Sequence, residues 1–141
     1  MAGEGADHHT RACKTARWSP TAIHLHEWRK HAKSLGYGME LIQSFGPRKL
    51  SRMIRRNNAL SEALGDDHDL FMVCRALHKE HRSHPSGDSG PLAKRISRKR
   101  AKLQERAFEL AKKLYSERPG GFHRRLCRWL RRAGHSDHKK S

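Results

Sequence analysis

Cationic and hydrogen-bonding side chains recur every three or four residues between positions 26 and 37. Residues with this spacing share one face of a helix, with about 5.4 Å between successive turns. An arginine can hold two oxygens of a phosphate through its planar guanidinium, and a lysine offers a mobile point charge. The row therefore suits a polymer that carries negative charge at regular intervals. It consists of His26, Arg29, Lys30, Lys33 and Tyr37.

A second basic row follows the same spacing in the C-terminal half, at Arg98, Lys99, Lys102 and Arg106. Residues 92–133 around it hold fifteen lysines and arginines against three glutamates. If the two helices pack as neighbours, both rows would line one basic groove. We interpret the two rows as a non-catalytic binding surface for a polyanion.

The composition supports an anionic partner. The 141-residue chain has 31 lysines and arginines against 14 aspartates and glutamates, which gives a formal net charge of +17. A charge this large concerns partners rather than fold, and it favours nucleic acid, an anionic membrane surface or phosphate. The length fits a single domain, and a hydrophobic fraction of 35% predicts a thin core.

The sequence argues against catalysis and against a bound metal or cofactor. It has no phosphate-binding loop and no nucleophile elbow, and its acidic residues are not grouped beside the basic rows. The run from Asp66 to Asp69 includes His68 but lacks the spacing of a known metal-ligand motif. We therefore predict no catalytic residue, no metal ligand and no cofactor.

Cysteine usage and hydropathy predict a cytoplasmic protein. Cys13, Cys74 and Cys127 lie far apart, and their odd number argues against a disulfide framework. No apolar run approaches the roughly 18 residues that a membrane span needs. The acidic N-terminus also lacks the basic start of a secretory signal. We expect reduced thiols and no membrane partner.

The hydrophobic pattern predicts an all-α antiparallel helical bundle. Apolar residues recur at helical spacing, for example at Trp28, Ala32, Leu35 and Met39, and no segment alternates like a strand. Short connections between successive helices favour antiparallel neighbours. Glycine, proline and small polar residues delimit five predicted helices, at about residues 20–45, 48–64, 66–82, 92–117 and 122–132.

These elements divide the chain into three parts. Residues 1–19 are small and polar without a helical period, so we expect a flexible N-terminal arm. Residues 20–133 form the predicted bundle, in which Gly65 marks the break between the second and third helices. Residues 134–141 are expected to form a disordered basic tail.

The sequence contains three motifs that follow one another along the chain. The first runs from Leu25 to Tyr37, and the second is the Leu-Gly-x-x-x-Asp segment from Leu64 to Asp69. The third is the basic segment that starts at Arg98 and ends in a Tyr-x-x-Arg-Pro pattern. Together they resemble the histidine helix, the corner and the long basic helix of the CHAD family, the conserved histidine α-helical domain. The motifs cover about residues 20–133.

The resemblance implies a fold and a ligand. CHAD domains consist of two similar helical bundles around a basic groove, and the family is known for binding inorganic polyphosphate. This chain is too short for both bundles and is most similar to the C-terminal half. The resemblance therefore implies a truncated copy, a half that forms a homodimer, or pairing with another CHAD half. Gly36 departs from the family pattern, which commonly has arginine there, and this thins the basic row.

The resemblance also assigns roles to individual residues. It implies that Asp69 is structural and pairs with a basic neighbour. Polyphosphate binding would associate the protein with polyphosphate granules. The implied polyphosphate-binding residues are His26, Arg29, Lys30, Lys33, Tyr37, Arg98, Lys99, Lys102 and Arg106.

Two other functions remain open. The same basic rows would hold the backbone of RNA or DNA without sequence preference, although an aromatic content of 6% leaves few platforms for base stacking. Alternatively, the chain is a protein-interaction or dimerisation module whose exposed half-groove binds another CHAD half.

Overall fold

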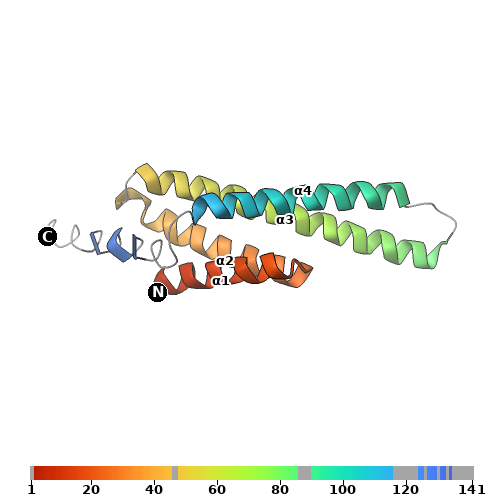
Figure 1. Cartoon of the computed structure of the whole chain (residues 1–141), viewed down its shortest axis with the longest axis horizontal. Coiled ribbons are helices and arrows are strands. Elements are labelled where there is room, and N and C mark those ends of the chain that lie inside the picture. The colour runs from red at the N-terminus through yellow and green to blue at the C-terminus, as the bar shows by residue number, and fades with distance from the viewer. Residues whose placement is uncertain are drawn as a thin grey trace.

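The described part of the chain consists of helices. The computed structural model describes residues 2–45, 48–85 and 90–115, together with residues 124–125, 127–129, 131–132 and 134. No strand occurs among these residues, which confirms the all-α class. The elements are α1 (Ala2–Trp18), α2 (Ala22–Leu41), the short 3-10 helix η1 (Gln43–Phe45), α3 (Arg48–Ser83) and α4 (Gly90–Leu114) (Figure 1).

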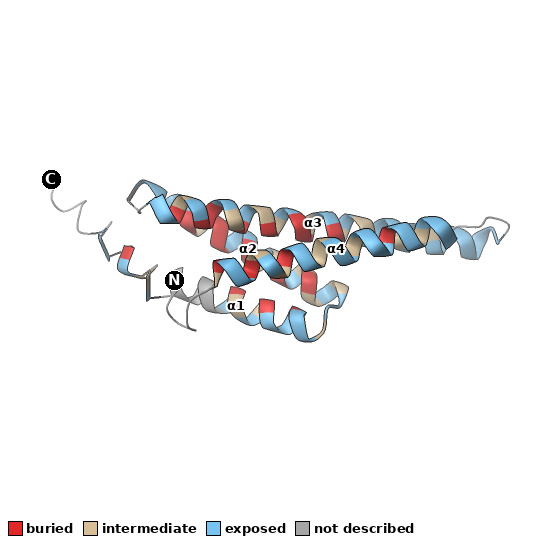
Figure 2. Ribbon diagram, turned by 45° about the horizontal axis from the view of Figure 1, so that its top comes forward, coloured by how far each residue is buried: buried red, intermediate tan, exposed pale blue. Residues whose placement is uncertain are grey.

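The helices form a bundle in which each helix packs on the next one along the chain. In addition, α1 touches α4. The long α3–α4 hairpin extends well beyond the α1–α2 pair (Figure 1). Apolar side chains on this projecting part are therefore half-exposed, at Met72, Val73 and Leu92. The core lies where all four helices overlap, and the buried residues line their inner faces (Figure 2).

The centre of the core is a stack of two aromatic side chains. Trp28 of α2 is fully buried, and its ring stacks on that of Phe108 of α4 with the ring centroids 5.0 Å apart. Leu60 and Leu64 of α3 pack in the same cluster. The apolar stripe predicted from Trp28 to Met39 is buried as expected, because helical spacing places it on one inner face.

A second cluster closes the end of the bundle near the end of α2. It joins Leu35 and Met39 of α2 to Leu50 and Met53 of α3. The apolar pattern of the predicted last helix would bury Phe122, Leu126, Trp129 and Leu130. Of these, Trp129 is buried in the same cluster. Residues 124–125, 127–129 and 131–132 are helical, whereas the side chains of Phe122, Leu126 and Leu130 lie outside the described residues. Most of the predicted tail, residues 135–141, lies outside them too.

The prediction of a flexible arm is wrong for residues 2–18, which form α1. His9, Cys13 and Ala16 of α1 are buried against the other helices. Their spacing of four and three residues places them on one face. Two of these three side chains are small or polar, so the segment lacks the strong apolar period that marks an amphipathic helix.

The predicted break at Gly65 is also wrong, because α3 runs through it as one helix of 36 residues. A Cβ at position 65 would lie 3.0 Å from Nε of Arg29, so the missing side chain makes room for an arginine of α2. Gly36 of α2 has a similar role beside Asn57, whose Nδ2 donates a hydrogen bond of 2.7 Å to the carbonyl oxygen of Ala32. Both glycines therefore permit close contact between α2 and α3.

Helix boundaries differ from the prediction by a few residues elsewhere. The hydroxyl of Thr21 caps α2 by accepting a hydrogen bond of 3.2 Å from the amide of His24. The predicted first helix ends as α2 at Leu41, and η1 follows it. The predicted fourth helix begins two residues earlier than expected, at Gly90.

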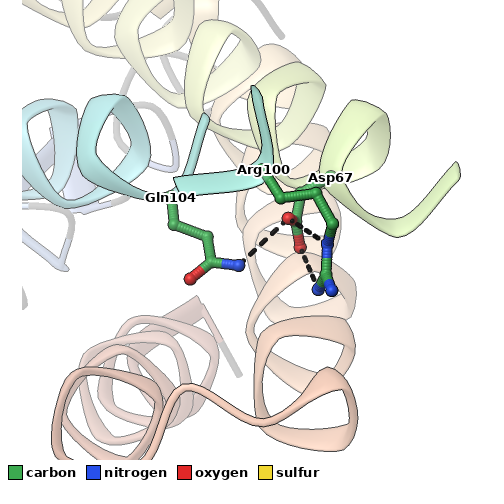
Figure 3. Close-up of polar contacts among 3 residues, drawn as sticks. All are labelled: Asp67, Arg100 and Gln104. Atoms are coloured by element: carbon green, nitrogen blue, oxygen red, sulfur yellow. Dashed lines mark hydrogen bonds and ion pairs between the residues drawn. The ribbon is translucent and has the colours of Figure 1, made fainter. Parts of the chain in front are cut away.

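A buried carboxylate joins α3 to α4. Asp67 is 2% exposed and accepts hydrogen bonds from Nε of Arg100 at 2.9 Å and from Nε2 of Gln104 at 3.0 Å (Figure 3). A second, longer bond of 3.4 Å comes from Nη2 of Arg100. The same guanidinium lies over the ring of Phe71, 5.1 Å from its centroid. Asp67 therefore fixes the register of α4 against α3.

A buried histidine joins α1 to the rest of the core. Nε2 of His9 lies 3.1 Å from the hydroxyl of Tyr115, and the ring packs edge-on against Trp28. Burial, together with the nearby charge of His31, lowers the pKa of His9 from 6.5 to about 3. His9 is therefore neutral in the folded protein at neutral and mildly acidic pH.

We expect Asp67→Asn to lower the free energy of unfolding by about 2–3 kcal/mol. The substitution leaves the Arg100 guanidinium without its carboxylate in a largely buried site, and this cost is high for buried ion pairs. Urea denaturation measures the loss. Asp66→Asn is the matched control, because Asp66 is exposed, and we expect almost no change. Equal effects of the two substitutions would contradict a structural role for Asp67.

We expect the buried His9 to make the fold sensitive to acid. The unfolded chain binds a proton at this histidine below about pH 6.5, whereas the folded chain does not until about pH 3. Stability is therefore lost as the pH falls through this window, by up to about 1.4 kcal/mol per pH unit. Between pH 7 and 4.5, the free energy of unfolding should fall less steeply with decreasing pH in His9→Gln than in the wild type. The exposed control His81→Gln should keep the wild-type slope, and equal slopes in all three proteins would exclude this role.

Candidate functional site

The first predicted row is divided by the structure. Arg29, Lys33 and Tyr37 line a cavity of about 340 Å³ between α2 and α3. Tyr37 is 63% exposed at its mouth. Gly36 and Gly65 line the cavity as well, so the two glycines that bring the helices together also shape this site.

The cavity carries mixed charge. Four carboxylates line it together with the two cations, at Glu40, Glu62, Asp66 and Asp69. Nε of Arg29 is buried and has no hydrogen-bond partner. Within the described part of the chain, neither Arg29 nor Lys33 forms an ion pair. Both cations are therefore available to an anionic group. The carboxylates beside them, however, would repel such a group.

His26 and Lys30 lie outside this cavity. The ring of His26 packs against that of His68 of α3, with the centroids 4.9 Å apart, and its Nδ1 is buried without a hydrogen-bond partner. Lys30 forms an ion pair of 3.2 Å with Glu27, and both side chains are exposed. The five residues of the row therefore have three different environments.

The second predicted row lies on the solvent-facing side of α4. Arg98, Lys99, Lys102 and Arg106 are all exposed, whereas Ile96, Ala107 and Leu114 on the inner side are buried. None of the four cations forms an ion pair with another described residue. We call these four residues, together with the exposed Arg95, the α4 row.

The prediction that the basic rows of α2 and α4 line one groove is wrong. Among the described residues, only those of α2 and α3 line the cavity that holds Arg29 and Lys33, and no residue of α4 reaches it. The physical reason is that α2 and α4 meet through the core at Trp28 and Phe108, and α3 packs against both of them. The rows therefore lie on different faces of the bundle.

The structural role expected for Asp69 belongs to Asp67. Asp69 is exposed, lines the α2–α3 cavity and has no ion pair among the described residues. The prediction placed a helix start at position 66, where an acidic residue would sit in the first turn. Because α3 is continuous there, position 67 rather than 69 faces α4.

Sequence reasoning missed a cationic groove between α1 and α4. Lys14 and Arg17 of α1 face Lys112 of α4 across a cavity of about 390 Å³. The site was not predicted because residues 1–19 were expected to form a flexible arm. The spacing of Arg11, Lys14 and Arg17 on a helix was the signal that could have revealed it.

Within the described ranges, no three histidine, cysteine, aspartate or glutamate side chains converge in a way that could hold a metal ion. The helices that the structure describes include none that is both long and apolar enough to cross a membrane.

Comparison with known proteins identifies the family. Neither the curated proteins nor the solved structures include a match to this chain. The family model of the CHAD domain matches residues 4–78, slightly more than half of the chain. The match covers α1, α2 and most of α3, and thus the first two of the three motifs seen in the sequence. The chain therefore belongs to the CHAD domain family.

Proposed function

We propose that this protein binds inorganic polyphosphate, without converting it, and that the α4 row is its principal contact. CHAD domains are associated with polyphosphate binding, and the chain belongs to this family. The net charge of +17 attracts a polyanion from a distance. Binding of this kind would associate the protein with polyphosphate granules.

The observation that carries the proposal is the exposure of the α4 row. Arg98, Lys102 and Arg106 follow one another at intervals of four residues, so they present a cation at about every 6 Å along the helix. These side chains are exposed and have no ion pair among the described residues. A flexible chain of phosphates can therefore contact several of them at once, and polyphosphate has no other feature to be recognised.

The α2–α3 cavity is a weaker candidate for the same ligand. Its two cations are accompanied by four carboxylates, which repel phosphate at close range. Arg29 and Lys33 nevertheless lack ionic partners in the described structure and would add a separate contact. A homodimer, or pairing with another CHAD half, could bring such a contact next to the α4 row of the partner.

Nucleic-acid binding is the second candidate, and one exposed side chain favours it. Trp18 at the end of α1 is 92% exposed, and bases of a single strand stack on exposed aromatic rings. Trp18 lies next to Arg17, which could contact the phosphate backbone. Trp18→Ala separates the two functions, since it should weaken binding of single-stranded RNA but not of polyphosphate.

We expect Arg98→Gln/Arg106→Gln to weaken binding of long-chain polyphosphate at least tenfold at near-physiological salt. The substitution removes two cations from one continuous row. Arg52→Gln/Arg55→Gln is the matched control, because it removes two exposed arginines of α3 that do not belong to this row. We expect the affinity of the control for long-chain polyphosphate to fall less than threefold. Fluorescence titration of labelled polyphosphate measures both, with circular dichroism to confirm folding.

Two results would contradict the proposal. The first is an equal loss in both variants, which would show that net charge alone determines binding. The second is displacement of labelled polyphosphate by RNA at the same phosphate concentration, which would favour a general polyanion surface. Both titrations need a fixed salt concentration, since counterion release makes such affinities fall steeply with salt.

A further inference from the structure

The groove between α1 and α4 has the composition of an anion site. Its cavity of about 390 Å³ lies within the usual range for small-molecule sites. Three cations line it, Lys14 and Arg17 from α1 and Lys112 from α4. The other described residues of its lining are Thr10, Cys13, Ala111 and Tyr115.

The charge of this groove differs from that of the α2–α3 cavity. Among the residues that the structure describes, no carboxylate lines the α1–α4 groove, whereas four line the cavity between α2 and α3. Within the described residues, Lys14, Arg17 and Lys112 have no ion pair. Like charges therefore face each other across the groove from two different helices, and this repulsion is not balanced by an acidic side chain of the lining.

The groove suits charge recognition better than base recognition. Phe108 at its side is already stacked on Trp28, and the guanidinium of Arg17 lies over the Phe108 ring at 5.5 Å from the centroid. Tyr115 packs its ring against His9, with centroids 5.1 Å apart. These aromatic rings are engaged within the fold, so a bound ligand would be held by its anionic groups.

We propose that the α1–α4 groove binds a compact phosphate polyanion, of the size of an inorganic triphosphate. The ligand would bridge Lys14 and Arg17 to Lys112 and thereby hold α1 against α4. This site is separate from the α4 row, and the inference does not depend on the binding of long-chain polyphosphate. A ligand that binds only the folded chain raises its stability, so the groove would couple the docking of α1 to the presence of phosphate compounds.

Calorimetric titration with inorganic triphosphate tests this site. The variant Lys14→Gln/Lys112→Gln removes one cation from each wall of the groove and leaves the contact of Arg17 with Phe108 in place. We expect its affinity to be at least tenfold weaker than that of the wild type. Lys79→Gln/Lys94→Gln is the matched control, because it removes two exposed lysines that belong neither to the groove nor to the α4 row. Its net charge equals that of the groove variant, and its affinity for triphosphate should fall less than threefold.

A second titration, with ATP, tests whether the groove recognises the phosphate charge or also the nucleoside. We expect ATP and inorganic triphosphate to bind the wild type within about threefold of each other, because the groove recognises phosphate charge. An ATP affinity more than tenfold higher would overturn this recognition by charge. Equal losses of triphosphate affinity in the two lysine variants would overturn the site itself. Neither result bears on the α4 row, which is tested with the long polymer.

Discussion

The arrangement of the bundle depends on the contact between Trp28 and Phe108. Trp28 is fully buried, stacks on Phe108 of α4 and meets the edge of His9 of α1, so a single side chain of α2 joins three helices. A buried aromatic pair of this kind contributes more than its area alone. Once Trp28 points to α4, its neighbour Arg29 is turned towards α3, where Gly65 leaves room for its guanidinium. The core therefore decides where the cations of α2 can go.

This geometry separates three cationic surfaces that have different electrostatic surroundings. The α2–α3 cavity combines Arg29 and Lys33 with carboxylates, whereas the described lining of the α1–α4 groove has cations and no carboxylate. The α4 row is an open line of cations. An open row suits a long polymer, whereas a groove between two helices suits a compact anion. Asp67 supports the row indirectly, because its bonds to Arg100 and Gln104 fix α4 on α3. The positive charge of the chain is thus distributed over distinct surfaces, and the net charge alone does not show this.

Sequence patterns predicted the helices and their inner faces better than the contacts between helices. The spacing of Trp28, Ala32, Leu35 and Met39 correctly identified a buried stripe, because periodicity reports which face of a helix is apolar. Periodicity does not report which helix covers that face, so the expected single groove was wrong. Glycine was read as a terminator at position 65, but there it accommodates a side chain from another helix. The helix α1 was missed because its buried face includes His9 and small residues.

The central claim is that the α4 row, rather than the α2–α3 cavity, is the track for polyphosphate. Mapping of backbone amide NMR shifts during titration of the full chain with long-chain polyphosphate tests this claim most directly. The account predicts that the largest shift changes fall on residues 95–106 of α4, with smaller changes around Arg29 and Lys33. Changes confined to the lining of the α2–α3 cavity, with residues 95–106 unaffected, would contradict it.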